Sequence, residues 1–257
     1  MKKLLLAALM SAASLSALAQ GANTIRFGVD PTFSPFESVD AQGKLVGVDI
    51  DLGNALCKQM QVTCDWVKIN FDGAIPALNA KKIDGILSGM IVTEARKKQV
   101  LFSSELYTTQ SRMMVPKGKE LDTTVESLKG KNIGIVQGTA QAAFANKHWK
   151  DKGVNLVTYQ NDERARQDLA LGRIDGTLQN AAAAQSFFES KEGANFQLSG
   201  KAVDDVAVFG PGVAIGLNRD NPALQTKINA ALLELHSNGT YDALLKPYAK
   251  YGIVAPK

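Results

Sequence analysis

Apolar positions follow two patterns along the chain: short continuous runs, and longer segments in which apolar residues recur every three to four positions. Residues 24–30 (TIRFGVD) and 62–69 (VTCDWVKI) are runs of the first kind, and residues 48–60 (VDIDLGNALCKQM) have the second, helical period. The order strand, helix, strand predicts parallel strands in one sheet with helices packed on its faces.

The same order of elements returns in the second half of the chain. Residues 131–138 (KNIGIVQG) and 155–160 (NLVTYQ) are predicted strands, and residues 139–151 (TAQAAFANKHWKD) between them form a predicted helix. Two such units predict two α/β lobes.

A short internal similarity supports this division into two units. Residues 77–89 (ALNAKKIDGILSG) and 168–180 (DLALGRIDGTLQN) share an Ile-Asp-Gly core after a basic turn. Each copy indicates the end of a helix followed by a short strand. The match is short enough for chance to remain an alternative, but the elements before each copy favour a repeat.

Three further segments set the expected lobe boundaries. Residues 102–119 indicate a crossover strand, residues 206–220 end in a strand-like stretch, and residues 222–240 form an amphipathic helix closed by Gly239. We predict a first lobe of residues 20–109 and 207–257, a second lobe of residues 110–206, and two crossings between them. Each lobe should be a mainly parallel sheet flanked by helices, with a ligand cleft where the carboxyl ends of the strands meet.

The first residues, MKKLLLAALMSAASLSALAQ, have a basic start, a short apolar run and small residues before position 20. This pattern predicts a signal peptide of residues 1–19, cleaved after Ala19. The apolar run is too short to span a bilayer, so we expect an exported chain without a membrane anchor.

Charge and composition argue against several function classes. The chain has 29 Lys and Arg against 25 Asp and Glu, and these charges are interspersed rather than clustered, which gives no reason to expect nucleic acid. Its two histidines, His148 and His236, are expected on a surface or in packing contacts. No catalytic triad, paired catalytic carboxylates or metal-ligand spacing is evident, so we expect neither an enzyme nor a cofactor or metal.

One strand end has the chemistry of a cation receptor. In FGVDPTFSPFE (27–37) the strand ends on Asp30, and Phe33 and Phe36 follow within six residues. A carboxylate beside ring faces attracts a cation both by charge pairing and by cation–π attraction.

Two other segments could hold an anion. Thr93 is a good N-cap, and Arg96 falls one turn into the helix that it starts, where a guanidinium can bind a carboxylate through two bonds. Val136 ends a strand, and the backbone N–H groups of the following helix start at residues 138–140 also suit an anion. Taken singly, a solvated arginine and an ordinary capped helix explain these segments equally well.

Together, GVDPTFSPF, KLVGVDIDLGNALCKQM, FDGAIPALNAKKIDGILSGMIVTEAR and IGIVQGTAQ resemble the periplasmic solute-binding proteins of polar amino acid ABC importers. The similarity is greatest to lysine/arginine/ornithine- and histidine-binding proteins and extends from about Ile25 to Ile253. It implies a type II two-lobe binding protein in the periplasm of a Gram-negative cell. It also implies a monomer that delivers a small cationic amino acid to an inner-membrane ABC permease.

The resemblance assigns roles to individual positions. Asp30 would bind the side-chain cation, Phe33 and Phe71 would sandwich the ligand, and Arg96 would bind the α-carboxylate together with backbone N–H groups of Gly89 and Ala140. Phe33 stands where the most similar relatives have tyrosine, and Ser88 matches a serine that contacts the ligand side chain. The complete expected set is Asp30, Phe33, Phe71, Ser88, Gly89, Ile91, Arg96, Val136, Thr139, Ala140 and Asn180.

Two positions depart from the family pattern for the α-ammonium group. Relatives have aspartate and serine where this chain has Asn180 and Ile91. A primary ammonium there would lack partners, which costs on the order of 1 to 3 kcal/mol. Three ligands therefore stay open: arginine or lysine, an octopine-like opine with a substituted amine, and a guanidino acid without an α-amine. A dehydratase-type enzyme and a chemosensory role on the same fold are the functional rivals.

The two cysteines, Cys57 and Cys64, are separated by six residues that could form a helix-to-strand turn. Export would permit a disulfide, with two buried free thiols as the alternative. In the relatives that the chain resembles, the matching pair is bridged.

Overall fold

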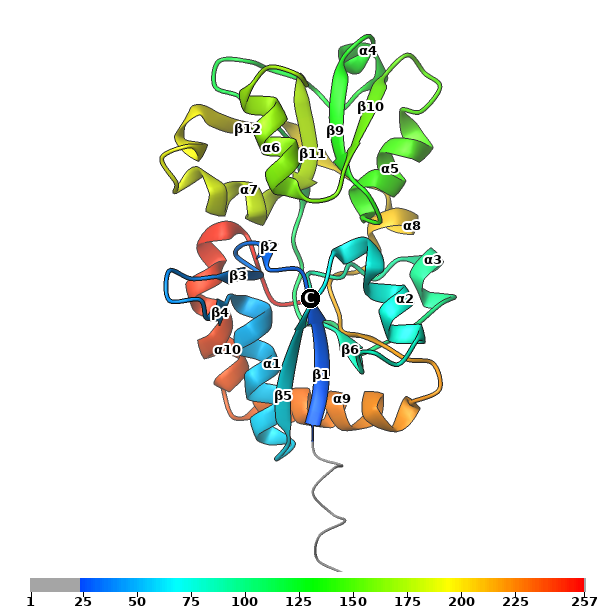
Figure 1. Ribbon diagram of the computed structural model, residues 1–257, viewed down its shortest axis with the longest axis vertical. Helices are drawn as coiled ribbons and strands as arrows, with labels where there is room; N and C mark the ends of the chain where they lie inside the picture. The colour runs from blue at the N-terminus through cyan, green and yellow to red at the C-terminus, as the bar shows by residue number, and fades with distance from the viewer. Residues whose placement is uncertain (1–23, 257) are drawn as a thin grey trace, which may run out of the picture.

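The computed structural model describes residues 24–256 as two α/β lobes, one above the other in Figure 1. The expected signal peptide, residues 1–19, lies outside the described residues. Within residues 24–256, no helix is long and apolar enough to cross a membrane.

The first lobe is built on a five-stranded mixed sheet. Its strand order is β5 (Thr63–Lys68), β1 (Thr24–Val29), β6 (Gly85–Ile86), β13 (Gly216–Leu217) and β7 (Leu101–Phe102). Strand β1 runs parallel to β5 and β6, whereas β13 is antiparallel to β6 and β7. The strands that were predicted from the strand–helix alternation, β1, β5 and β6, thus form the parallel part of the sheet.

The second lobe repeats this arrangement. Its strand order is β10 (Asn155–Tyr159), β9 (Asn132–Val136), β11 (Gly176–Asn180), β8 (Ser111–Pro116) and β12 (Phe196–Val203). Strand β9 is parallel to β10 and β11, and β8 is antiparallel to β11 and β12. The predicted two-lobe α/β fold is confirmed. Both sheets are mixed because β8 and β13, which follow the chain crossings, enter their sheets antiparallel to the parallel strands.

The internal similarity corresponds to equivalent strands. Strands β6 and β11 each pair in parallel with the first strand of their strand–helix–strand unit, β1 and β9 respectively. The aspartate before each strand accepts a hydrogen bond from that first strand: Asp84 from the Arg26 N–H at 2.9 Å, and Asp175 from the Asn132 N–H at 2.8 Å. The shared Ile-Asp-Gly core thus has the same structural role in both lobes.

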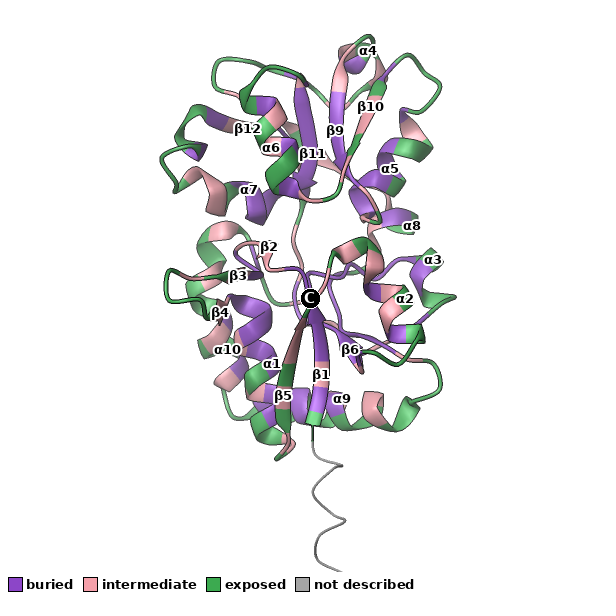
Figure 2. Cartoon of the chain, in the orientation of Figure 1, coloured by how far each residue is buried: buried purple, intermediate pink, exposed green. Residues whose placement is uncertain are grey.

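Helices cover both sheets, and each carries buried residues along part of its surface (Figure 2). In α9, Ile228, Leu232 and Leu235 are buried while Leu233 is 67% exposed, as expected for a 3.6-residue period. The first lobe contains α1 (Val48–Gln59), α2 (Ala74–Asn79), α3 (Glu94–Lys97), α9 (Pro222–Ser237) and α10 (Thr240–Leu245), and the second contains α4 (Val125–Leu128), α5 (Ala140–His148), α6 (Asp162–Ala170) and α7 (Ala181–Phe188). Within residues 24–256, 3₁₀ turns lie at Phe71–Gly73, Gly193–Asn195 and Lys246–Tyr251.

A small three-stranded sheet follows the end of β1. It consists of β2 (Thr32–Phe33), β3 (Glu37–Val39) and β4 (Leu45–Val46). Strand β2 contacts α6 of the other lobe, so this sheet lies on the side of the first lobe that faces the second.

Two predicted segments differ from the structure. Residues 206–220 form helix α8 (Val206–Phe209) and only a two-residue strand, β13, because the glycines and proline between them interrupt regular structure. Within residues 102–119, the crossover strand β8 begins only at Ser111. The Phe209 ring packs against Phe144 of α5, with 5.5 Å between ring centroids, so α8 contacts the second lobe. The lobe boundaries at residues 109/110 and 206/207 stay predictions.

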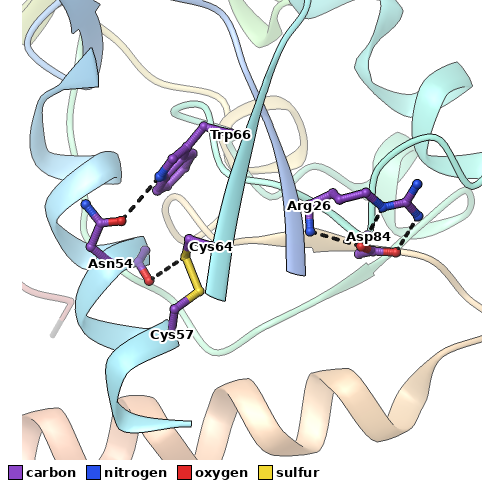
Figure 3. The surroundings of a disulfide bond; sticks show 7 residues. Arg26, Asn54, Cys57, Cys64, Trp66 and Asp84 are labelled. Carbon is purple, nitrogen blue, oxygen red and sulfur yellow. Dashed lines mark hydrogen bonds and ion pairs between the residues drawn. A yellow bond between two sulfur atoms is a disulfide. The ribbon is translucent and has the colours of Figure 1, made fainter. Parts of the chain in front are cut away.

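Cys57 and Cys64 form a disulfide, with their Cα atoms 5.8 Å apart (Figure 3). Cys57 belongs to α1 and Cys64 to the edge strand β5, so the bond ties a covering helix to the sheet beneath it. Beside it, the Trp66 indole N–H donates to the Asn54 side chain at 3.2 Å.

Replacing both cysteines by alanine should lower the free energy of unfolding by about 2 kcal/mol, because the bond closes a short loop in the unfolded chain. Urea unfolding of the two forms measures this difference. Ligand affinity should stay unchanged, since neither cysteine lines the cavity between the lobes. An equally stable double variant would show that the disulfide contributes nothing to the fold.

Candidate functional site

A cavity lies between the two lobes and is lined by residues of both. All eleven residues expected at the site surround it. Four lining residues were missed by sequence reasoning: Thr32, Gln141, Asn161 and Asp162. The full lining is Asp30, Thr32, Phe33, Phe71, Ser88, Gly89, Ile91 and Arg96 from the first lobe, and Val136, Thr139, Ala140, Gln141, Asn161, Asp162 and Asn180 from the second.

These residues meet because strands of both sheets end at the cavity. Asp30 follows β1, Ser88 follows β6 by two residues, and Val136 and Asn180 are the last residues of β9 and β11. The carboxyl ends of parallel strands share one edge of a sheet, and the two sheets turn these edges toward each other (Figure 1).

The lobes touch around the cavity, so the structure is a closed form. The Gln137 amide donates to Asp72 at 2.5 Å, and the Ser34 and Ser186 hydroxyls lie 2.9 Å apart. Glu189, the residue directly after α7, accepts from Lys250 at 2.6 Å, which adds a third contact between the lobes. Outside the cavity, the contacts that hold the lobes together are thus exposed or half-buried polar contacts.

Asp30 is held rigidly at the first-lobe side of the cavity. Its Oδ1 accepts from the Thr32 N–H at 3.1 Å and the Thr32 hydroxyl at 2.7 Å. Its Oδ2 accepts only a longer bond, 3.3 Å, from the Phe71 N–H. The side chain is 7% exposed, and Oδ2 retains capacity for a stronger donor.

Rings and one glycine shape the wall next to Asp30. Phe33 stacks on Phe36, with 4.7 Å between ring centroids. A Cβ at Gly89 would lie 2.7 Å from the Phe33 ring, and Gly89 has φ +55°, a conformation that favours glycine. Any larger residue at position 89 would therefore displace the ring.

Arg96 is a buried cation without an anion. Thr93 caps its helix and accepts from the Arg96 N–H at 3.1 Å. The guanidinium donates to the Ile91 carbonyl at 2.6 Å and, across the lobes, to the Gly138 carbonyl at 2.9 Å. Burial lowers the pKa of Arg96 to about 10, and no carboxylate of the described residues pairs with it. Its remaining donors suit an anionic group in the cavity.

The start of α5 adds donors to the same region. The Thr139 hydroxyl accepts from the Ala142 N–H at 3.1 Å, so Thr139 caps the helix. The N–H groups of Ala140 and Gln141 lie in the first turn, where the helix itself provides no acceptor. Together with Arg96 they form a donor-rich wall suited to a carboxylate.

Gly89 differs from its expected role. Its N–H donates to Asp49 Oδ2 at 2.6 Å and is therefore not available to a ligand carboxylate. Ser88 is similarly engaged: its hydroxyl accepts from the Asp30 N–H at 3.1 Å and donates to Glu37. These two residues build the floor of the cavity and hold Asp30 in place.

Beneath this floor lie two fully buried acids, Glu37 and Asp49. Burial, with the charge of Asp49 added, raises the pKa of Glu37 well above its usual range. Burial also raises the pKa of Asp49 to about 6, although hydrogen bonds from Tyr107 and Gly89 lower it in part. Of the two acids, Glu37 therefore holds a proton more readily than it would in water, and the hydrogen bonds from Tyr107 and Gly89 favour the charge on Asp49.

Asn180 presents a donor rather than an acceptor. Its Oδ1 accepts from the Ala182 N–H at 2.9 Å, as the N-cap of α7, and from the Thr109 hydroxyl at 3.0 Å. Because a backbone N–H requires an oxygen, the amide orientation is fixed. The side-chain NH₂ group is left for the cavity, and it cannot accept a hydrogen bond from an ammonium.

The two histidines lie away from the cavity. His148 contacts Asp205 at 2.7 Å, and His236 packs on the Tyr241 ring with 3.8 Å between centroids. In the part of the chain that the structure describes, no three His, Cys, Asp or Glu side chains are grouped to hold a metal ion.

Two α/β lobes closed over one shared cavity define a periplasmic binding protein fold. Residues 25–251 match the bacterial extracellular solute-binding proteins, family 3, and the chain belongs to this family. The lysine/arginine/ornithine-binding periplasmic protein of Escherichia coli (strain K12) is 44% identical over 244 residues, covering 95% of this chain and 93% of that protein. The histidine-binding periplasmic protein of Salmonella typhimurium (strain LT2) is 42% identical over 257 residues, covering 98% and 99%.

A solved structure gives the same result for the fold. An ancestral arginine-binding protein bound to arginine has a TM-score of 0.82 and 36% identity, covering 88% of this chain and 98% of that one. The resemblance to lysine/arginine/ornithine- and histidine-binding proteins is therefore confirmed.

The buried acids predict an unusual pH dependence. An acid whose folded-state pKa lies above its unfolded value binds more protons when folded, so stability falls as pH rises between the two values. For Glu37 this window begins near its ordinary pKa of 4.5 and extends upward. Glutamine does not titrate, so the free energy of unfolding of Glu37→Gln should rise relative to that of wild type as the pH rises. The difference between the two proteins should change by about 1 kcal/mol from pH 4.5 to pH 8. Urea unfolding at both pH values measures the gain; a pH-independent difference would contradict it.

Proposed function

We propose that this chain is a periplasmic receptor that captures a cationic, carboxylate-bearing amino acid of the arginine class. Binding across the cavity favours the closed form, because only there do residues of both lobes contact one molecule. The loaded, monomeric receptor then delivers its ligand to an inner-membrane ABC importer.

One observation carries this proposal: Asp30 and Arg96, which have opposite charges, line the same cavity, and no hydrogen bond or ion pair of the described residues joins them. A ligand with a cation at one end and a carboxylate at the other satisfies both. The relatives are named as lysine/arginine/ornithine- and histidine-binding proteins, and these names support the same class of ligand.

Binding without catalysis is part of the proposal. The polar groups in the lining are hydrogen-bond donors and carboxylates, and both histidines lie elsewhere. Ligand recovered after incubation with the protein should have an unchanged mass.

Removing the charge of Asp30 tests the cation site. Asp30→Asn keeps an oxygen for Thr32 but should weaken L-arginine binding at least tenfold, because a buried guanidinium loses its charged partner. Calorimetry on protein refolded from denaturant, which strips carried-over ligand, measures the affinity. Asp65→Asn is the matched control, since Asp65 is exposed on β5 and does not line the cavity. Equal arginine affinity in wild type and Asp30→Asn would refute the cation site.

A second candidate ligand is an octopine-like opine, and Asn180 is the observation that favours it. An opine has a secondary amine and an additional carboxylate arm. The free NH₂ group of Asn180 can donate to that arm, whereas it offers nothing to a primary ammonium.

Asn180→Asp distinguishes the two candidates. Aspartate is an equally good N-cap, so α7 should keep its start while a second carboxylate oxygen faces the cavity. Affinity for L-arginine should rise about tenfold, or about 1.4 kcal/mol, and affinity for octopine should fall. Calorimetry with both ligands measures the change, and the thermal unfolding of the ligand-free variant checks the fold. Weaker arginine binding would show that the α-ammonium lies elsewhere.

A further inference from the structure

Asp162 is a carboxylate in the cavity to which the proposed binding site assigns no role. It is the first residue of α6, directly after the N-cap Asn161, whose side chain accepts from the Arg164 N–H at 3.1 Å. Asp162 is only 8% exposed, and it lines the same cavity as Asp30. No described residue donates a hydrogen bond to its carboxylate, which is costly for a buried acid.

Asp162 lies on the second lobe, near the Asp30 side of the cavity. Helix α6 contacts β2, the strand whose Thr32 holds Asp30. Burial raises the pKa of Asp162; the charge of Arg166 opposes this effect and the charge of Asp30 adds to it. The two carboxylates therefore repel each other from opposite lobes.

The nearby arginine, Arg166, acts on Asp162 through space but does not contact its carboxylate. Arg166 is one helical turn beyond Asp162, but its guanidinium lies over the Phe187 ring, 4.7 Å from the centroid. No hydrogen bond joins Arg166 to Asp162 in the described part of the chain. The cavity that Asp162 lines is therefore where a cation could contact its carboxylate directly.

We propose that Asp30 and Asp162 form one cation site that spans the lobes and selects a guanidinium over an ammonium. The inference rests on the proposed function and specifies its ligand. A guanidinium has five N–H donors arranged around a plane, so one edge can bind Asp30 while the other binds Asp162. Its plane also suits the Phe33 and Phe71 rings that line the same cavity.

An ammonium satisfies this site less well. It is a compact, strongly hydrated charge, and its three donors do not lie on two opposed edges. Bridging by a guanidinium replaces the repulsion between the two acids with two attractions. The ligand cation thereby joins the lobes at one end of the cavity, as the carboxylate does at the Arg96 end.

Asp162→Asn tests the site, with Glu163→Gln as the matched control. Both variants remove one negative charge from the first turn of α6, but Glu163 is exposed and does not line the cavity. Calorimetry with L-arginine, L-lysine and L-citrulline, the uncharged analogue of arginine, should show that wild type prefers arginine. Asp162→Asn should bind arginine at least about tenfold more weakly than wild type, while its affinity for citrulline stays within about threefold. The ratio of arginine affinity to lysine affinity should be smaller than in wild type. Glu163→Gln should match wild type for all three ligands.

Thermal unfolding of ligand-free Asp162→Asn separates lost binding from lost folding. Its midpoint should equal or exceed that of wild type, because the substitution removes a buried, unpaired charge. Arginine affinity within twofold of wild type would overturn the inference, as would an equal loss for arginine and citrulline, or a wild type that prefers lysine. In each case the proposed function would stand. A wild-type protein that binds no cationic ligand would overturn the proposed function itself.

Discussion

The site depends on one unbalanced charge, the buried guanidinium of Arg96 at the seam between the lobes. Two backbone carbonyls, one from each lobe, accept its hydrogen bonds, but carbonyl dipoles do not replace a counter-ion. The helix start at Ala140 faces the same cavity and also favours negative charge. In the proposed function a ligand carboxylate completes this region, and its binding would stabilise the lobe contact that Arg96 already makes.

The opposite end of the cavity has the reverse imbalance. Asp30 is fixed by the Thr32 and Phe71 N–H groups, and Asp162 lines the same cavity from the other lobe. The floor between them is rigid because the buried pair of Glu37 and Asp49 bonds the hydroxyl of Ser88 and the N–H of Gly89. Charge at the two ends and a preorganised floor explain how a small cavity can select a dipolar ligand and couple its binding to closure.

Sequence patterns predicted the parallel parts of both sheets, because apolar runs and helical periods are local properties. They did not predict that Gly89 gives its N–H to Asp49, since that bond joins residues forty positions apart. Asp162 was missed for a related reason: an acid in the first turn after an Asn cap is ordinary helix chemistry in sequence. Only the packing of α6 against β2 brings that acid to the cavity that Asp30 lines. Asn180 was expected to offer a dipole, but its capping role decides which end of that dipole faces the ligand.

A crystal structure of the protein with L-arginine tests the central claim most directly. The account predicts that the ligand carboxylate lies within hydrogen-bond distance of Arg96 and the Ala140 N–H, while the guanidinium contacts Asp30. A ligand bound in the reverse orientation, or on a surface outside the cavity between the lobes, would contradict it.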